Sequence, residues 1–201
     1  MPSAGADLPQ VRVRTRAEWR RWLAKNHASP GSIWLVIPKK TSGGKVSYDD
    51  VVEEGLCFGW VDSRTRPLDD ECYMLLFSPR RAKSGWSRTN KERVARLTER
   101  GLMAAPGLAK IEAAKKDGSW SSLDAIENLE LPPELAKAFA ANAAARRQFD
   151  GFTRSARKVI LLWIASAKRP ETRARRVEET VRLAALGLPA GRPEATRKTR
   201  G

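Results

Sequence analysis

The residues best suited to bind a ligand lie where an apolar run ends and a helix is expected to begin. Arginine holds carboxylate and phosphate groups through paired N–H donors, and the first backbone N–H groups of a helix attract the same anions. Tryptophan can stack on a planar group. The sequence therefore predicts an anion-binding corner formed by Arg80, Arg81, Ser84, Ser87 and Asn90, within a ligand-binding set that also includes Trp60, Asp62 and Trp86.

Two interpretations of this corner stay open at the level of sequence. In the first, Arg80 and its neighbours bind an external oxyanion. In the second, Arg80 pairs internally with Asp62 or Asp69, and Trp86 only fills the core. A structure in which Arg80, Ser84, Trp86 and Asn90 line one pocket would favour the first.

Groups that could support catalysis are few. Ser63 follows Asp62 but lacks the Gly-x-Ser-x-Gly elbow of hydrolases. His27 is the sole histidine and stands where a helix is expected to end, so a capping role is predicted for it. Cys57 lies among aromatic residues that suppress thiol reactivity. We assign no catalytic residue, and keep a small-molecule enzyme built on Asp62, Ser63 and Arg80 as the alternative.

The sequence also lacks a motif typical of a metal or cofactor site. One histidine and two cysteines fifteen positions apart match no zinc spacing. The glycine-rich segment 39–45 lacks the full Walker motif and is interpreted as a basic turn. We therefore predict no metal and no cofactor.

A β-hairpin must hold the corner in place. Residues 60–63 and 73–77 have the alternating and apolar patterns of strands, and Pro67 with Asp69 supplies turn chemistry between them. Another strand is expected at 32–38, and Thr15, Ser47 and Ser87 are suited to begin helices. After Pro132-Pro133 every segment has helical periodicity.

These patterns predict an α+β fold, with a small antiparallel sheet packed by helices and an all-helical C-terminal subdomain. The expected boundaries are a disordered tail at 1–10, a main domain at 11–130, a helical module at 131–188 and a disordered basic tail at 189–201. No apolar run reaches the roughly 18 residues that would span a membrane, and the N-terminus lacks a signal core. A cytoplasmic protein with reduced, buried Cys57 and Cys72 is expected.

The net charge is +15. Residues 79–100 hold eight Lys or Arg against two Glu, and residues 151–201 hold thirteen against four. Such excess fits an anionic ligand or weak, salt-sensitive nucleic-acid binding, or else arginines that only solvate helices. No zinc-finger, RNA-recognition or helix-turn-helix signature is present.

Several separated motifs follow one another in a fixed order along the chain. They are Trp34, Lys39-Lys40, Cys57 to Ser63, Pro79-Arg80-Arg81, Ser84, Trp86-Ser87, Asn90, Gly101, Met103 and Ala167 to Arg173. With these motifs the sequence, from about Trp19 to Leu186, resembles the YdeI/OmpD-associated family, also called bacteriocin-protection proteins. The resemblance implies a link to bacteriocin protection or the stress response, through a binding module or a protein partner, and it implies no particular reaction, ligand or oligomeric state. It also implies that the helical module is similar to a module attached to other domains.

Overall fold

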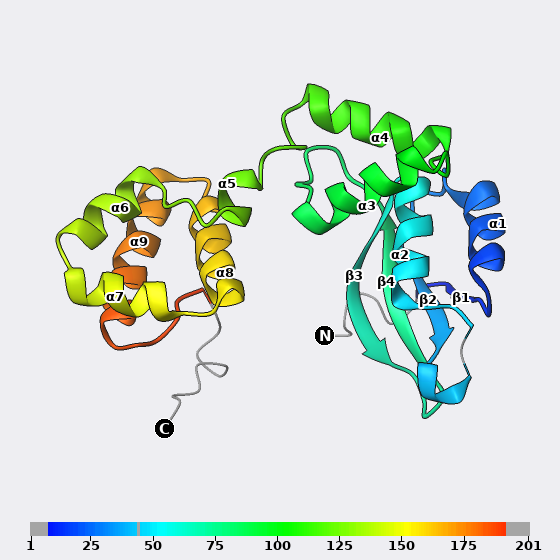
Figure 1. Cartoon of the computed structure of the whole chain (residues 1–201), viewed down its shortest axis with the longest axis horizontal. Helices are drawn as coiled ribbons and strands as arrows, with labels where there is room; N and C mark the ends of the chain where they lie inside the picture. Colours follow the sequence, from blue (N-terminus) through cyan, green and yellow to red (C-terminus); the bar gives the residue numbers. More distant parts are fainter. Residues whose placement is uncertain (1–7, 44, 192–201) are drawn as a thin grey trace. The chain divides into compact units, whose positions relative to one another are not determined.

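The computed structural model describes residues 8–43 and 45–191, and its contacts divide the chain into two compact units at Ser122 (Figure 1). Unit 1 is residues 1–122 and unit 2 is residues 123–201. The sequence placed this boundary at residue 130. The predicted tails lie for the most part, at 1–7 and 192–201, outside the described residues.

Unit 1 is built on a four-stranded sheet in the order β1-β2-β4-β3. β3 and β4 form the predicted hairpin, and the Asp69 carboxylate in its turn accepts from the N–H groups of Glu71 (2.9 Å) and Cys72 (2.6 Å). The register shifts between Asp62 and Thr65. β1 pairs in parallel with β2, so the sheet is mixed rather than purely antiparallel. The strands are β1 (Gln10–Arg12), β2 (Ile33–Pro38), β3 (Trp60–Pro67) and β4 (Cys72–Pro79).

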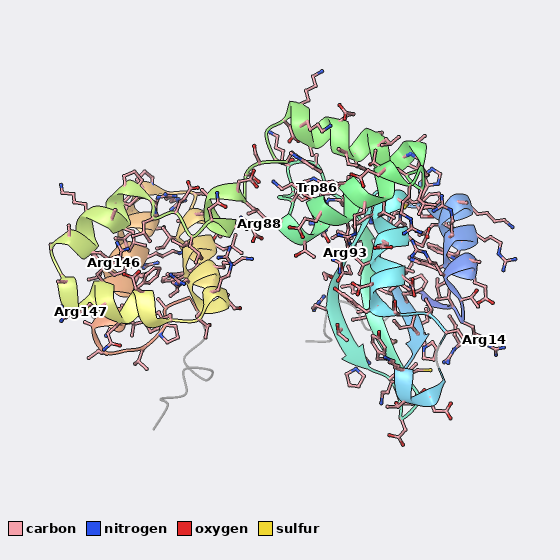
Figure 2. The ribbon with its side chains drawn as sticks, in the orientation of Figure 1. Arg14, Trp86, Arg88, Arg93, Arg146 and Arg147 are labelled. Carbon is pink, nitrogen blue, oxygen red and sulfur yellow. The ribbon has the colours of Figure 1, made fainter. Side chains whose placement is uncertain are left out.

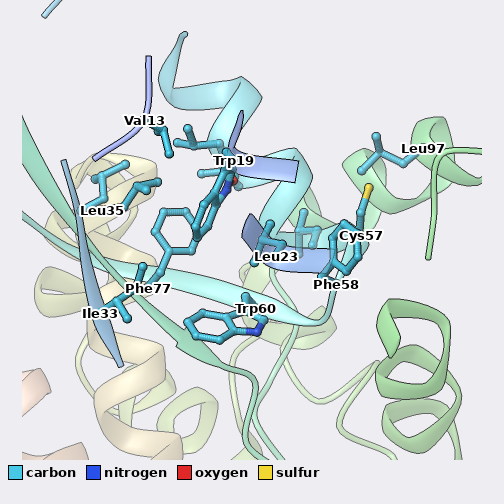
Figure 3. Close-up of a cluster of buried hydrophobic side chains, with 14 of the residues drawn as sticks. Val13, Trp19, Leu23, Ile33, Leu35, Cys57, Phe58, Trp60, Phe77 and Leu97 are labelled. Atoms are coloured by element: carbon cyan, nitrogen blue, oxygen red, sulfur yellow. The ribbon is translucent and has the colours of Figure 1, made fainter. Parts of the chain in front are cut away.

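The two faces of this sheet carry different clusters because neighbouring strand residues point in opposite directions. On one face Leu35 and Phe77 join Trp19 and Trp60 in the main core (Figure 3). On the other face Trp34 and its neighbours form a smaller buried cluster. The main core receives side chains from the helices α1 (Arg16–Asn26), α2 (Tyr48–Cys57), α3 (Arg88–Glu99) and α4 (Ala105–Lys116), with a short 3-10 turn, η1 (Lys40–Ser42), after β2.

The predicted helix starts are found where the capping residues stand. Thr15, Ser47 and Ser87 each accept a hydrogen bond from the backbone N–H three residues later. These bonds satisfy donors that have no partner inside the helix. Local sequence therefore fixes where α1, α2 and α3 begin.

Unit 2 is helical and has a core of its own. Phe139, Phe149 and Ile164 are buried in it, and Ala190, which the sequence placed in the C-terminal tail, is buried there too. The α+β class with a helical C-terminal part is confirmed. Its helices are α5 (Asp124–Glu127), α6 (Pro133–Ala140), α7 (Ala143–Gly151), α8 (Arg154–Ala165) and α9 (Pro170–Ala185).

Candidate functional site

The loop between β4 and α3 places Arg80 against the start of the hairpin. The N–H of Arg80 donates to the carbonyl of Gly59 at 2.9 Å, which extends the strand pairing by one residue. The loop then turns through Lys83, whose φ of 60° lies in the left-handed region. The Ser84 hydroxyl closes the turn by donating to the Arg81 carbonyl at 2.8 Å. Figure 2 shows Trp86 just ahead of α3.

Two glycines let α4 pack closely against the end of α2 and the turn before β3. A Cβ on Gly107 would lie 2.2 Å from the carbonyl oxygen of Cys57, so only glycine allows the two backbones to meet here. Gly59 has a φ of 75°, and a Cβ on it would lie 2.7 Å from Cγ of Lys110. The close packing brings Lys110 and the last turn of α4 beside Arg80.

Arg80 begins a row of contacts in which two tryptophan rings lie between two cations. Its guanidinium carbon lies 3.7 Å from the centroid of the Trp86 ring, and the Trp86 and Trp120 rings are 5.0 Å apart. Lys91 Nζ lies 5.7 Å from the Trp120 centroid. Cation–π contacts of this kind contribute about 0.5 to 2 kcal/mol each. This row of contacts fixes the guanidinium in one orientation.

The charge of Arg80 is not compensated by a direct ion pair with any residue that the structure describes. The residue is 4% exposed, its Nη2 donates to the Gly85 carbonyl at 2.8 Å, and its buried Nε has no hydrogen-bond partner among residues 8–43 and 45–191. Within the described ranges it forms no ion pair with a carboxylate. Burial lowers the pKa of Arg80 to about 10, an effect that the charge of Asp62 partly opposes. The side chain is therefore still cationic at neutral pH.

A second buried charge shows the usual arrangement. Glu54 is 2% exposed, and its carboxylate binds Arg16 and Arg20, each at 2.7 Å. Buried charges normally have such partners because burial without one costs several kcal/mol. Arg80 departs from this rule, and so it marks a candidate site.

Arg80 lines a small pocket of about 70 Å3, called here the Arg80 pocket. The loop forms one side and α4 with the residues after it forms the other. The Ser119 hydroxyl is also buried and makes no hydrogen bond of normal geometry to any described residue. The lining residues are Arg80, Arg81, Ala82, Lys83, Ser84, Trp86, Lys110, Ala113, Ala114, Asp117 and Ser119.

The structure brings four of the eight predicted site residues to this pocket, namely Arg80, Arg81, Ser84 and Trp86. Ser87 and Asn90 do not line it. Ser87 caps α3, and the Asn90 side chain accepts from Arg93 at 3.2 Å. The N-terminus of α3, which was predicted to form part of the corner, therefore does not line this pocket.

Trp60 and Asp62 also lie elsewhere. Trp60 is fully buried, and its Nε1 donates to the His27 carbonyl at 3.0 Å. Asp62 accepts from the Tyr48 hydroxyl at 2.6 Å and forms no ion pair with Arg80 in the described structure. Asp69 is engaged in the hairpin turn. Among the described residues, therefore, neither Asp62 nor Asp69 forms the internal pair with Arg80 that competed with the anion site.

Sequence reasoning did not find the α4 side of the pocket. Lys110, Asp117 and Ser119 are thirty or more residues from Arg80 along the chain, and no motif links them to it. The sequence carried one indirect sign of the α4 side of the pocket: Gly107 lies inside a helix, and a glycine in such a position often has a packing reason such as a close backbone approach.

The groups considered for catalysis are engaged separately. The Ser63 hydroxyl donates to the Leu76 carbonyl at 3.4 Å. The His27 ring lies 3.3 Å from the carbonyls of Leu23 and Ala24, which matches the predicted capping role. Burial, with the charge of Glu54, raises the pKa of the Cys57 thiol. Cys57 and Cys72 are free and buried, as predicted.

Two further properties concern the described residues as a whole. In 8–43 and 45–191, no three His, Cys, Asp or Glu side chains gather as metal ligands. No helix in the same ranges has the length and apolarity needed to cross a bilayer.

Two family models match the chain in different places. Residues 128–187 match the family described as "Bacteriocin-protection, YdeI or OmpD-Associated", so a YdeI/OmpD-associated domain occupies most of unit 2. Residues 11–110 match "Domain of unknown function (DUF8412)". Searches of the curated proteins and of the solved structures gave no match.

The predicted resemblance is thus confirmed for the helical unit, which holds the run from Ala167 to Arg173. The hairpin motifs that also carried the resemblance lie within residues 11–110, which match the domain of unknown function. Most residues of the Arg80 pocket lie in the same range. The bacteriocin-protection description therefore applies to unit 2, and the chemistry of the pocket depends on the residues that line it.

Proposed function

We propose that unit 1 is a non-catalytic binding module that holds a small oxyanion in the Arg80 pocket. The observation that carries this proposal is the buried guanidinium of Arg80, which is stacked on Trp86 and which, in the described part of the chain, has no carboxylate partner and an unpaired Nε. An oxyanion would supply the missing counter-charge and acceptor. Charge-assisted hydrogen bonds of this type contribute about 1.5 to 3 kcal/mol each.

The surroundings of Arg80 support the same ligand class. Lys83 and Lys110 belong to the pocket lining and add positive charge, and Arg81 lies at its edge. Neither lysine forms an ion pair in the part of the chain that the structure describes. Anions entering the pocket therefore meet cations from both the loop and α4.

The pocket volume limits the ligand. One water needs roughly 10 to 15 Å3 of such volume, so about 70 Å3 accommodates a small anion such as phosphate and excludes a base or a nucleoside. A larger ligand would place only its anionic group here.

The test is thermal unfolding in increasing phosphate, with sodium chloride added to hold the ionic strength constant. A site with a Kd of about 1 mM, at twenty times that concentration, would stabilise unit 1 by about 1.8 kcal/mol. We expect a rise in Tm for the wild type and none for Arg80→Met.

A milder pair of variants distinguishes binding in the pocket from a general effect of positive charge on the protein surface. Lys110→Met removes a charge from the pocket and keeps an apolar stem over Gly59. Lys116→Met makes the same change on an exposed part of α4 that does not line the pocket. We expect Lys110→Met to weaken phosphate binding about two- to fivefold and Lys116→Met to leave it unchanged. Equal effects of both, or no stabilisation of the wild type, would contradict the proposal.

The YdeI/OmpD-associated domain of unit 2 supports a wider proposal, in which the chain takes part in bacteriocin protection or a stress response. A cytoplasmic location and a salt-sensitive contact with nucleic acid remain predictions from the sequence. Unit 1 would then act as the part that senses or retains the anion.

A further inference from the structure

The lining of the Arg80 pocket includes one carboxylate. Asp117 stands at the C-terminal end of α4, where one of its oxygens accepts from the N–H of Ser119 at 2.9 Å and the other from the N–H of Lys83 at 3.3 Å. A carboxylate offers about four acceptor positions. Asp117 can therefore accept a further hydrogen bond from a ligand.

Asp117 is ionised at neutral pH. The neighbouring Ser119 hydroxyl and N–H, together with the N–H of Lys83, hold the pKa of its carboxyl below the usual range. The C-terminal end of α4 adds partial negative charge from its carbonyl groups. The pocket thus presents cationic donors from the loop and from Lys110 of α4, together with one anionic acceptor, Asp117, at the end of α4.

A ligand with acceptors alone does not satisfy both the cations and the carboxylate. Sulfate would accept from Arg80 and Lys110, but its oxygens would also face the Asp117 carboxylate and be repelled by it. A phosphate that keeps one acidic hydrogen avoids this conflict, because its P–OH can donate to Asp117 while its charged oxygens accept from Arg80. Hydrogen bonds between a hydroxyl and a carboxylate are among the short, strong ones.

We propose that the Arg80 pocket selects a protonated oxyanion, of the class of hydrogen phosphate and its monoesters, over a fully deprotonated one such as sulfate. Asp117 is the specificity-determining residue. The inference rests on the proposed anion site, and it adds which anion the site takes. The small volume of the pocket requires the substituent of a monoester to point out of its mouth.

Calorimetric titration of the wild type with sodium phosphate and with sodium sulfate, at neutral pH and equal ionic strength, tests the selection directly. We expect phosphate to bind about tenfold more tightly. In Asp117→Asn the side-chain amide removes the repulsion and can donate to sulfate, so the preference should fall to about one. Asp70→Asn, an exposed change in the hairpin turn, should keep the wild-type preference.

A measurement on the wild type alone covers the case in which Asp117→Asn fails to fold. Methyl phosphate loses its last proton with a pKa of about 6. Inorganic phosphate keeps a proton from about pH 5 to about pH 8. The ratio of the affinity for methyl phosphate to the affinity for inorganic phosphate should therefore fall about tenfold over this range.

The outcomes separate this inference from the proposed function. Equal binding of phosphate and sulfate by the wild type, or tighter binding of sulfate, would overturn the selection and leave the anion site standing. Binding of neither anion would overturn both.

Discussion

Gly107 offers the sharpest test of how unit 1 is held together. Alanine at this position would place a methyl carbon 2.2 Å from the Cys57 oxygen and 2.8 Å from the Leu56 oxygen. Carbon and carbonyl oxygen normally stay about 3.3 to 3.6 Å apart, so α4 would have to retreat from α2 by about 1 Å. The obstacle is backbone, which cannot rotate away as a side chain could.

The cost of Gly107→Ala follows from two opposing effects. Overpacking of this kind costs about 1 to 3 kcal/mol, and a rigid backbone obstacle puts it at the upper end. Alanine in a helix regains up to about 1 kcal/mol relative to glycine. We therefore expect the unfolding free energy of unit 1 to fall by about 1 to 2 kcal/mol. Gly151→Ala in α7, where a Cβ would meet nothing within 4 Å, should be neutral or slightly stabilising.

Urea unfolding followed by tryptophan fluorescence measures this change selectively. Six of the seven tryptophans lie before residue 123, so the signal comes mainly from unit 1. With a slope of about 2 kcal/mol/M, the midpoint of Gly107→Ala should fall by roughly 0.5 to 1 M. Phosphate binding should weaken too, because α4 carries Lys110 and Asp117. A midpoint equal to that of the wild type would refute the close backbone contact.

Three other predictions concern different parts of the molecule. Trp60→Ala and Trp86→Ala should each lower the unfolding free energy of unit 1 by about 3 to 5 kcal/mol in the same urea assay, because both rings are buried. An unchanged urea midpoint in either variant would contradict the burial of that ring. Partial desolvation of its half-exposed ring and the hydrogen bond to Asp62 raise the pKa of Tyr48 to about 12. Its neutral phenol therefore stabilises the fold fully below about pH 10, and this contribution is lost as the pH rises through about 12. Tyrosinate absorbance should show one group shifting down in Asp62→Asn, and an unchanged alkaline titration would exclude the hydrogen bond. A chain ending at Ser122 should keep the near-ultraviolet dichroism of its tryptophans, since both clusters of the sheet lie within unit 1; loss of that signal would show that unit 2 is needed for folding.

Local patterns predicted the elements of this fold well. The hairpin, its Asp69 turn and the helix starts at Thr15, Ser47 and Ser87 depend on bonds between residues a few positions apart. Such bonds are encoded in short stretches of sequence. β1 was missed because its three residues carry no periodicity, and its pairing with β2 is parallel and distant in the chain.

The candidate site was only half predictable for the same reason. Arg80 and Trp86 lie on one short loop, so sequence could place them together. The α4 side depends on the close crossing of two helices at Gly107, which no local pattern reveals. Asn90 was assigned to the corner by its position near a helix start, but Arg93 on the next turn occupies its side chain.

The order of the strands has a consequence for self-association. β1 and β3 are the edges of the sheet, and an unprotected edge can add a strand from another molecule. β1 is only three residues long, while β3 has an irregular register after Asp62 and carries the exposed Arg64, Arg66 and Pro67. Neither edge offers a flat, uncharged ladder. Amyloid-like growth at high concentration should therefore require unfolding first, since the apolar strands β2 and β4 lie protected between them.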